Sequence, residues 1–127
     1  LQHSNLNRIK KLKNVFLLGY RKYKHLPSYC AYFDVAWLPL IHNNYTKSMF
    51  PMKFFEYLAA GLPVVSTDLE SIREYGKLVA VSDDISKIKI SIIEALKNKN
   101  SNLKNRLSLA MENTYQKRTK KMLMELN

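Results

Sequence analysis

Four short, continuous apolar runs lie along the first two thirds of the chain, at residues 15–18, 35–40, 63–67 and 78–81. Gly19 closes the first run, and Pro63 opens the third at a place where a strand can lack a hydrogen-bond donor. Unbroken apolar runs, unlike alternating ones, are typical of strands covered on both faces, as in parallel sheets. The pattern therefore predicts four parallel strands.

Segments with helix signals fill the intervals between these runs. The expected helices cover residues 28–33, 52–60 and 69–75, a stretch from Asp83 or Asp84 to about residue 97, and residues 103–126. Asp68 is expected to cap the third helix, and Gly61 suits the position just after the second. In the last helix the positions expected to be buried recur at near-helical spacing: Leu103, Leu107, Ala110, Met111, Tyr115, Met122 and Leu126.

This alternation of strands and helices predicts an α/β fold with a doubly wound, Rossmann-like parallel sheet and a long C-terminal helix. The 127 residues fit one domain. We therefore expect a single α/β domain over residues 1–127, with residues 101–127 as its closing helix. Ligands of such sheets bind beyond the carboxyl ends of the strands, which directs attention to the segments that follow the apolar runs.

The charge of the chain is strongly basic, at +11, from 21 basic and 10 acidic residues. Seven basic residues lie in residues 8–24 and eight in residues 97–121. Solvated faces are the first interpretation of this pattern, an anionic membrane surface the second, and nucleic acid the last. Because no nucleic-acid-binding motif is recognisable, we expect no nucleic-acid partner.

Cysteine and histidine are too few to support a disulfide framework or a metal cluster. Cys30 is the single cysteine, and it is expected to be a small core residue. Asp83 and Asp84 are adjacent and are interpreted as a helix cap. We expect no metal and no cofactor.

No apolar run approaches the roughly 18 residues of a membrane span, and the chain does not begin like a signal peptide. A cytoplasmic location is therefore expected.

The segment most informative about chemistry joins the second strand to the second helix. Residues 41–50 form a polar loop that is long for such a connection, and the start of the following helix offers free N–H groups to an anion. Lys53 and Glu56 lie three residues apart on one helix face. They could form a surface ion pair, or Lys53 could contact a phosphate while Glu56 accepts hydrogen bonds from sugar hydroxyls. The residue pattern leaves both alternatives open.

The order of motifs resembles one protein family over about residues 15–126. The central stretch, residues 51–65, reads PMKFFEYLAAGLPVV and resembles a signature of the donor-binding, carboxy-terminal half of GT-B glycosyltransferases, most of all those of bacterial cell-surface polysaccharides. Flanking stretches agree in order with the same family: GY at 19–20, LPSY at 26–29, FDVAWLP at 33–39 and TYQKR at 114–118.

The resemblance implies a nucleotide-sugar site with roles for particular residues. Glu56 would hold the ribose hydroxyls of the nucleotide. The other implied groups are Lys53, the backbone N–H groups of Phe50 and Met52, and Ser48 at the diphosphate, Gly19, Tyr20 and Arg21 in a loop beside the base, and Thr46 and Lys47 in the loop that faces the donor sugar. The implied substrate is a UDP-, GDP- or ADP-sugar, and the implied reaction is glycosyl transfer without a metal.

The chain also departs from the family pattern. Ser48 stands where many members carry a second Glu, so the role of that carboxylate is not transferred. The first strand or strands of the donor domain and the acceptor-binding domain are not recognisable, so no catalytic residue is assigned and the chain alone is expected to be inactive. An acceptor saccharide, free or lipid-linked, would bind through the missing domain. The enzyme would work in the cytoplasm, with a peripheral place at the inner face of the plasma membrane as an option.

Two other functions are kept as alternatives. The first is a nucleotide-sugar epimerase on the same fold, whose further catalytic residues would lie outside this chain. The second is a non-catalytic α/β docking module. A receiver domain is a poor match because the strand ends lack the acidic cluster that it needs.

Overall fold

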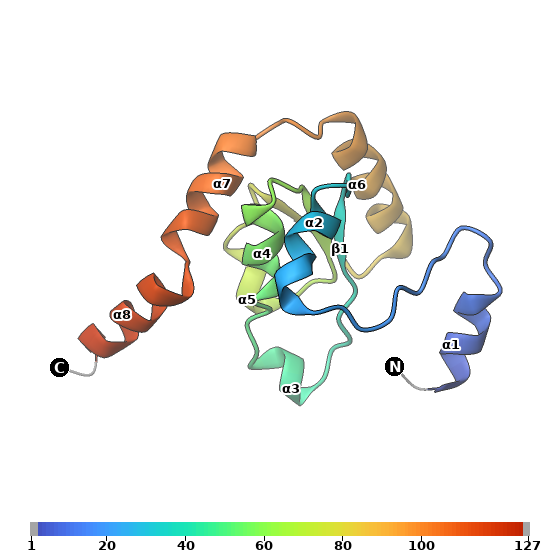
Figure 1. Ribbon diagram of the computed structural model, residues 1–127, viewed down its shortest axis with the longest axis horizontal. Helices are drawn as coiled ribbons and strands as arrows, with labels where there is room; N and C mark the ends of the chain where they lie inside the picture. Colours follow the sequence, from blue (N-terminus) through green and yellow to red (C-terminus); the bar gives the residue numbers. More distant parts are fainter. Residues whose placement is uncertain (1–2, 126–127) are drawn as a thin grey trace.

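The computed structural model describes residues 3–125 as an α/β fold with one parallel sheet (Figure 1). Its strands are β1 (Ala36–Leu38), β2 (Val64–Ser66) and β3 (Val79–Val81). The elements before α4 are the helices α1 (His3–Lys10), α2 (Leu26–Cys30) and α3 (Asn44–Lys47), and the 3-10 helix η1 (Tyr23–His25). The later helices are α4 (Lys53–Ala59), α5 (Glu70–Arg73), α6 (Ile85–Lys97), α7 (Leu103–Glu112) and α8 (Tyr115–Glu125).

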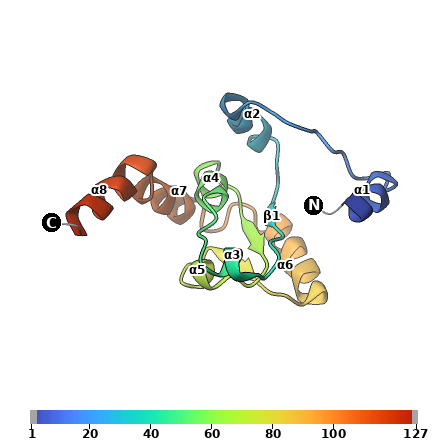
Figure 2. The same ribbon diagram turned by 90° about the horizontal axis from the view of Figure 1, so that it is seen from below.

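The sheet has the order β1-β2-β3, and both pairs of neighbouring strands are parallel. Val64 of the central strand pairs with Ala36 on one side and Val79 on the other. All three residues of β2 are buried, and because successive side chains point to opposite faces, both faces of the sheet are covered. Helices α4 and α6 lie on opposite sides of the strands (Figures 1 and 2). The predicted α/β class is therefore confirmed.

The strand predicted at residues 15–18 is wrong. The segment is irregular, and within residues 3–125 the sheet has three strands. The side chain of Phe16 is 79% exposed and that of Leu17 is 50% exposed. Apolar residues predict burial, but a strand forms only where a neighbouring strand supplies hydrogen bonds, and the described residues place none beside this segment.

The single closing helix predicted over residues 103–126 is also wrong, because α7 and α8 are separate helices. The break lies at two residues whose side chains compete with the helix for backbone groups. The Asn113 amide donates to the carbonyl of Leu109 at 2.9 Å, and the Thr114 hydroxyl accepts from the N–H of Lys117 at 3.3 Å.

Most of the side chains predicted to be buried in this closing segment are exposed. Ala110 is buried as predicted, and Leu126 lies outside the described residues. The exposed ones are Leu103, Leu107, Met111, Tyr115 and Met122. Helix α7 packs on α4, whereas α8 leads away from the sheet (Figure 1). Apolar residues at helical spacing therefore did not identify which side of these helices is buried.

Of the three features predicted at helix ends, two are confirmed and one is wrong. Asp84 caps α6 by accepting from the N–H groups of Ser86 and Lys87. Gly61 ends α4 with φ at +76°, and its N–H donates to Leu58 while that of Leu62 donates to Tyr57, which is a Schellman motif. The prediction for Asp68 is wrong: its carboxylate accepts two hydrogen bonds from Arg73 and does not cap α5.

The core lies where α4 meets the sheet. Its fully covered side chains include Phe54, Leu58 and Ile72, each with 0% exposure, and Val64 of β2 belongs to the same cluster. Within residues 3–125, every helix is too short or too polar to span a lipid bilayer.

Candidate functional site

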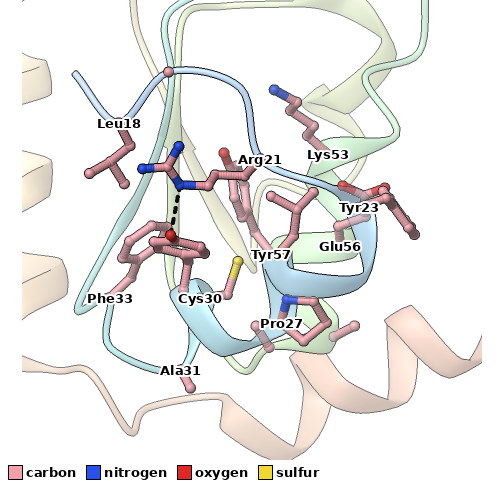
Figure 3. Close-up of a pocket in the computed structure, with 15 residues that line it drawn as sticks. Leu18, Arg21, Tyr23, Pro27, Cys30, Ala31, Phe33, Lys53, Glu56 and Tyr57 are labelled. Atoms are coloured by element: carbon pink, nitrogen blue, oxygen red, sulfur yellow. Dashed lines mark hydrogen bonds between the residues drawn. The ribbon is translucent and has the colours of Figure 1, made fainter.

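A cavity of about 550 Å³ lies between α2, α4 and the segment that precedes η1 (Figure 3). This volume falls within the roughly 300–1,000 Å³ of small-molecule sites. Four of the residues predicted for donor binding line it together, namely Gly19, Arg21, Lys53 and Glu56. Its other lining residues are Leu18, Tyr23, Leu26, Pro27, Tyr29, Cys30, Ala31, Phe33, Tyr57, Ala59 and Ala60.

Lys53 and Glu56 reach this cavity from the first turn of α4. Lys53 is exposed and Glu56 is half-buried. The surface ion pair that was one interpretation of these residues is not formed within the described part of the chain. Instead, the hydroxyl of Tyr23 donates to Glu56 Oε1 at 3.1 Å. This hydrogen bond, with the charge of Glu56, raises the pKa of Tyr23.

Tyr23 is a site residue that the sequence analysis missed. Its partner Glu56 lies 33 positions further along the chain, and no local pattern connects the two. The one signal in the sequence was that Tyr23 lies close to Gly19 and Arg21, which were already predicted to line the site.

The predicted base-side loop borders the cavity through two of its three residues. Gly19 has φ at +70°, and no atom lies within 4 Å of where a Cβ would be, so the backbone there faces open space. Arg21 Nε donates to the hydroxyl of Tyr29 at 2.7 Å, and Arg21 Nη1 donates to the carbonyl of Tyr20 at 2.9 Å. The Tyr20 side chain is 87% exposed and is not among the lining residues.

The segment just before α4 contributes packing, not cavity lining. Phe50 stacks on Phe55 with ring centroids 4.9 Å apart, and the guanidinium of Arg118 lies over both rings. Met52 is half-buried at the N-cap of α4. Phe50, Met52 and Ser48, which the resemblance assigned to the diphosphate, do not line the 550 Å³ cavity. Lys53 is the basic side chain that α4 brings to this cavity.

Thr46 and Lys47, predicted for the donor-sugar loop, lie beside a second cavity of about 390 Å³. Thr46 is buried, and its hydroxyl donates to the carbonyl of Ile41 at 2.6 Å while it accepts from the N–H of Asn43 at 2.9 Å. Together with the Asn43 side chain this makes a capping box for α3. The Thr46 side chain therefore holds the loop in shape.

A charged network lies at the carboxyl edge of the sheet near this second cavity. His42 Nε2 lies 2.8 Å from Asp83 Oδ1, and the same carboxylate oxygen accepts from the N–H of Asp68 at 3.0 Å. The hydrogen bond from His42 and then that from Asp68 lower the pKa of Asp83. Arg73 in turn binds Asp68 through two nitrogens. The network fastens together the segments that follow β1, β2 and β3.

Metal ligands and reactive thiols do not gather at either cavity. Within the described residues, no three side chains of the metal-binding kinds lie close enough together to hold an ion. Cys30 is half-buried, packs against the core and lines the larger cavity. Burial raises the pKa of its thiol, so that the nucleophilic thiolate is disfavoured.

Comparison with known proteins gives a family. One relative, TuaH of Bacillus subtilis (strain 168), carries a name that assigns it provisionally to teichuronic acid biosynthesis as a glycosyltransferase, and it is 39% identical over 67 residues. That match covers 53% of this chain and 17% of TuaH, so the chain spans a small part of this relative. No solved structure matches. The family model described as Glycosyl transferases group 1 matches residues 2–98, well over half of the chain, and the chain therefore belongs to the glycosyl transferases group 1 family.

Proposed function

We propose that this chain forms the donor-binding part of a glycosyltransferase that uses a UDP-, GDP- or ADP-sugar in the synthesis of a surface polysaccharide. One observation carries the proposal: a single cavity is lined by Lys53 and Glu56 from α4 and by Gly19 and Arg21 from a distant segment. The family match and the name of the TuaH relative support the reaction class and the polysaccharide.

The cavity offers complementary groups to the two polar parts of a nucleotide. The ionised carboxylate of Glu56 accepts hydrogen bonds, which the hydroxyls of a ribose can donate. The ammonium group of Lys53, one helical turn away, carries the positive charge that a diphosphate requires. The apolar remainder of the wall, including Leu26, Pro27 and Phe33, can exclude water from a bound base.

The proposed chemistry follows from this placement. When the glycosidic bond of the donor breaks, negative charge grows on the nucleoside diphosphate. A cation fixed where that charge develops stabilises the transition state more than the ground state. Lys53 supplies this charge, so the proposal assigns no metal to the reaction. The groups that activate the acceptor are not assigned to this chain.

The proposed partners follow from the reaction class. The acceptor is a saccharide, free or lipid-linked, held by another part of the enzyme. A lipid-linked acceptor would place the reaction at a membrane surface on the cytoplasmic side, which suits the basic charge of the chain.

Titration of the chain with UDP, GDP and ADP, followed by thermal unfolding, tests the proposal. We expect one diphosphate to stabilise the fold, by about 2.7 kcal/mol at 100 times its Kd. Glu56→Gln and Lys53→Met should each weaken binding by about tenfold or more, because each removes a charged partner. Glu94→Gln, at an exposed position of α6, is the matched control and should leave affinity unchanged.

The same titration separates the alternatives. A folded chain that is indifferent to all three diphosphates contradicts donor binding and favours the docking module. If binding survives both Glu56→Gln and Lys53→Met, the nucleotide binds elsewhere. The family match favours the transferase over the epimerase, and epimerisation of a UDP-sugar by the complete enzyme would reverse that preference.

A further inference from the structure

The hydrogen bond between Tyr23 and Glu56 joins two elements that both line the larger cavity. Tyr23 belongs to η1, and Glu56 belongs to α4. We propose that Tyr23 is a positioning residue of the donor site, whose hydroxyl holds one carboxylate oxygen of Glu56 so that the other faces the ribose diol. This inference rests on the proposed function.

The backbone of Tyr23 is fixed by the elements around it. Within η1, the N–H of His25 donates to the carbonyl of Lys22 at 2.9 Å, and the N–H of Leu26 donates to that of Tyr23. The 3-10 helix continues directly into α2, and Leu26, Pro27 and Cys30 of that helix line the same cavity. The Tyr23 hydroxyl is therefore delivered to Glu56 by a defined turn, although its side chain is 65% exposed.

The cations near Glu56 do not take this role. Within residues 3–125, Lys53 forms no ion pair with Glu56, and the guanidinium of Arg21 is held by Tyr29 and by the carbonyl of Tyr20. Tyr23 is the side chain that restrains the Glu56 carboxylate in the described part of the molecule.

The chemistry of the pair favours binding of a diol. A carboxylate has two oxygens and about four acceptor positions, so one hydrogen bond from Tyr23 leaves room for the two hydroxyls of a ribose. The hydroxyl of a tyrosine is a donor at neutral pH, and Glu56 raises the pKa of Tyr23 further. A glutamate side chain fixed in advance loses less conformational freedom when the ligand binds.

The test compares ligands with and without the diol. Whichever of UDP, GDP and ADP binds is titrated calorimetrically, beside its 2′,3′-dideoxy analogue, into the unaltered chain, Tyr23→Phe and Tyr32→Phe. Tyr32, which is 88% exposed and outside the cavity, is the matched control. We expect Tyr23→Phe to weaken the ribose ligand by roughly three- to tenfold and the dideoxy ligand by less than about twofold. Tyr32→Phe should change neither.

Other outcomes overturn the inference. Unchanged or tighter binding of the ribose ligand by Tyr23→Phe would show that the hydroxyl does not prepare Glu56. Equal weakening of both ligands would give Tyr23 a general structural role, which the unfolding midpoint of the variant would also report. If none of the three diphosphates binds the unaltered chain, the proposed function fails first. If Glu56→Gln weakens binding and Tyr23→Phe does not, only this inference fails.

Discussion

Arg106 shows how one side chain fastens separate parts of the chain. It is 3% exposed, and its guanidinium donates to the backbone carbonyls of Gly61, Lys99 and Ser101. These carbonyls belong to the end of α4 and to the connection between α6 and α7. Burial lowers the pKa of Arg106, because the charge has lost water as a solvent. Three hydrogen bonds take the place of that water.

Truncation of this side chain should destabilise the fold. Arg106→Ala leaves three carbonyls without their donor and a space where the guanidinium lay, so we expect a loss of roughly 2–4 kcal/mol in the free energy of unfolding. Urea unfolding measures the change. Lys104→Ala, at an exposed position of the same helix, should cost less than about 0.5 kcal/mol. Equal losses in the two variants would show that the three hydrogen bonds contribute little.

At the scale of elements, the end of α4 helps to position the helix that lines the larger cavity. Gly61 stops α4 in the left-handed conformation, and a Cβ there would lie 2.8 Å from Leu103 Cδ1 of α7. The turn at Gly61 also presents the carbonyl that Arg106 binds. The face of α4 that bears Lys53 and Glu56 lines the larger cavity, while α7 packs on another part of α4.

The cap of α6 offers a test at this scale. The Asp84 carboxylate accepts from the N–H groups of Ser86 and Lys87, which lack partners within the helix. Asp84→Ala should therefore lower the free energy of unfolding by about 1 kcal/mol. Asp84→Asn keeps an acceptor at the cap and should lose only a few tenths of that, by the same urea measurement. Similar losses for both substitutions would contradict a capping role.

At the scale of the whole molecule, the net charge of +11 is combined with a helix that leads away from the sheet. None of the residues of α8 is buried, and its sequence is YQKRTKKMLME. Lys120 and Lys121 are exposed, as are Met122, Leu123 and Met124. A helix that exposes both cations and apolar side chains has the chemistry of a surface that meets anionic lipid headgroups.

Vesicle sedimentation tests the proposed membrane association. We expect binding to vesicles with phosphatidylglycerol, little binding to pure phosphatidylcholine, and loss of binding as the Debye length falls from about 10 Å at 0.1 M salt to about 3 Å at 1 M. Replacing Lys120 and Lys121 by Gln removes about 1 kcal/mol each, or roughly 30-fold in total. The same change at Lys10 and Lys11 is the control. Binding that persists at high salt, or that is absent at low salt, contradicts the proposal.

Sequence reasoning selected two residues of one element that the structure places at the same cavity. Lys53 and Glu56 are one turn apart on α4, and both line the larger cavity. The segment that supplies Gly19 and Arg21 reaches the same cavity, as the resemblance implied. Thr46 and Lys47 instead border a second cavity, and the Tyr23–Glu56 contact was not foreseen. Roles of individual residues in donor binding remain predictions.

The amino-acid sequence by itself determined the parallel α/β class, the end of α4 at Gly61 and the cap of α6 at Asp84, because apolar runs, left-handed turns and helix caps depend on residues close together in the chain. Only the tertiary structure decided that residues 15–18 form no strand, that Arg106 is buried, and that Tyr23 meets Glu56. Each of these depends on partners distant in the chain, and neither apolarity nor spacing specifies which partner will be there.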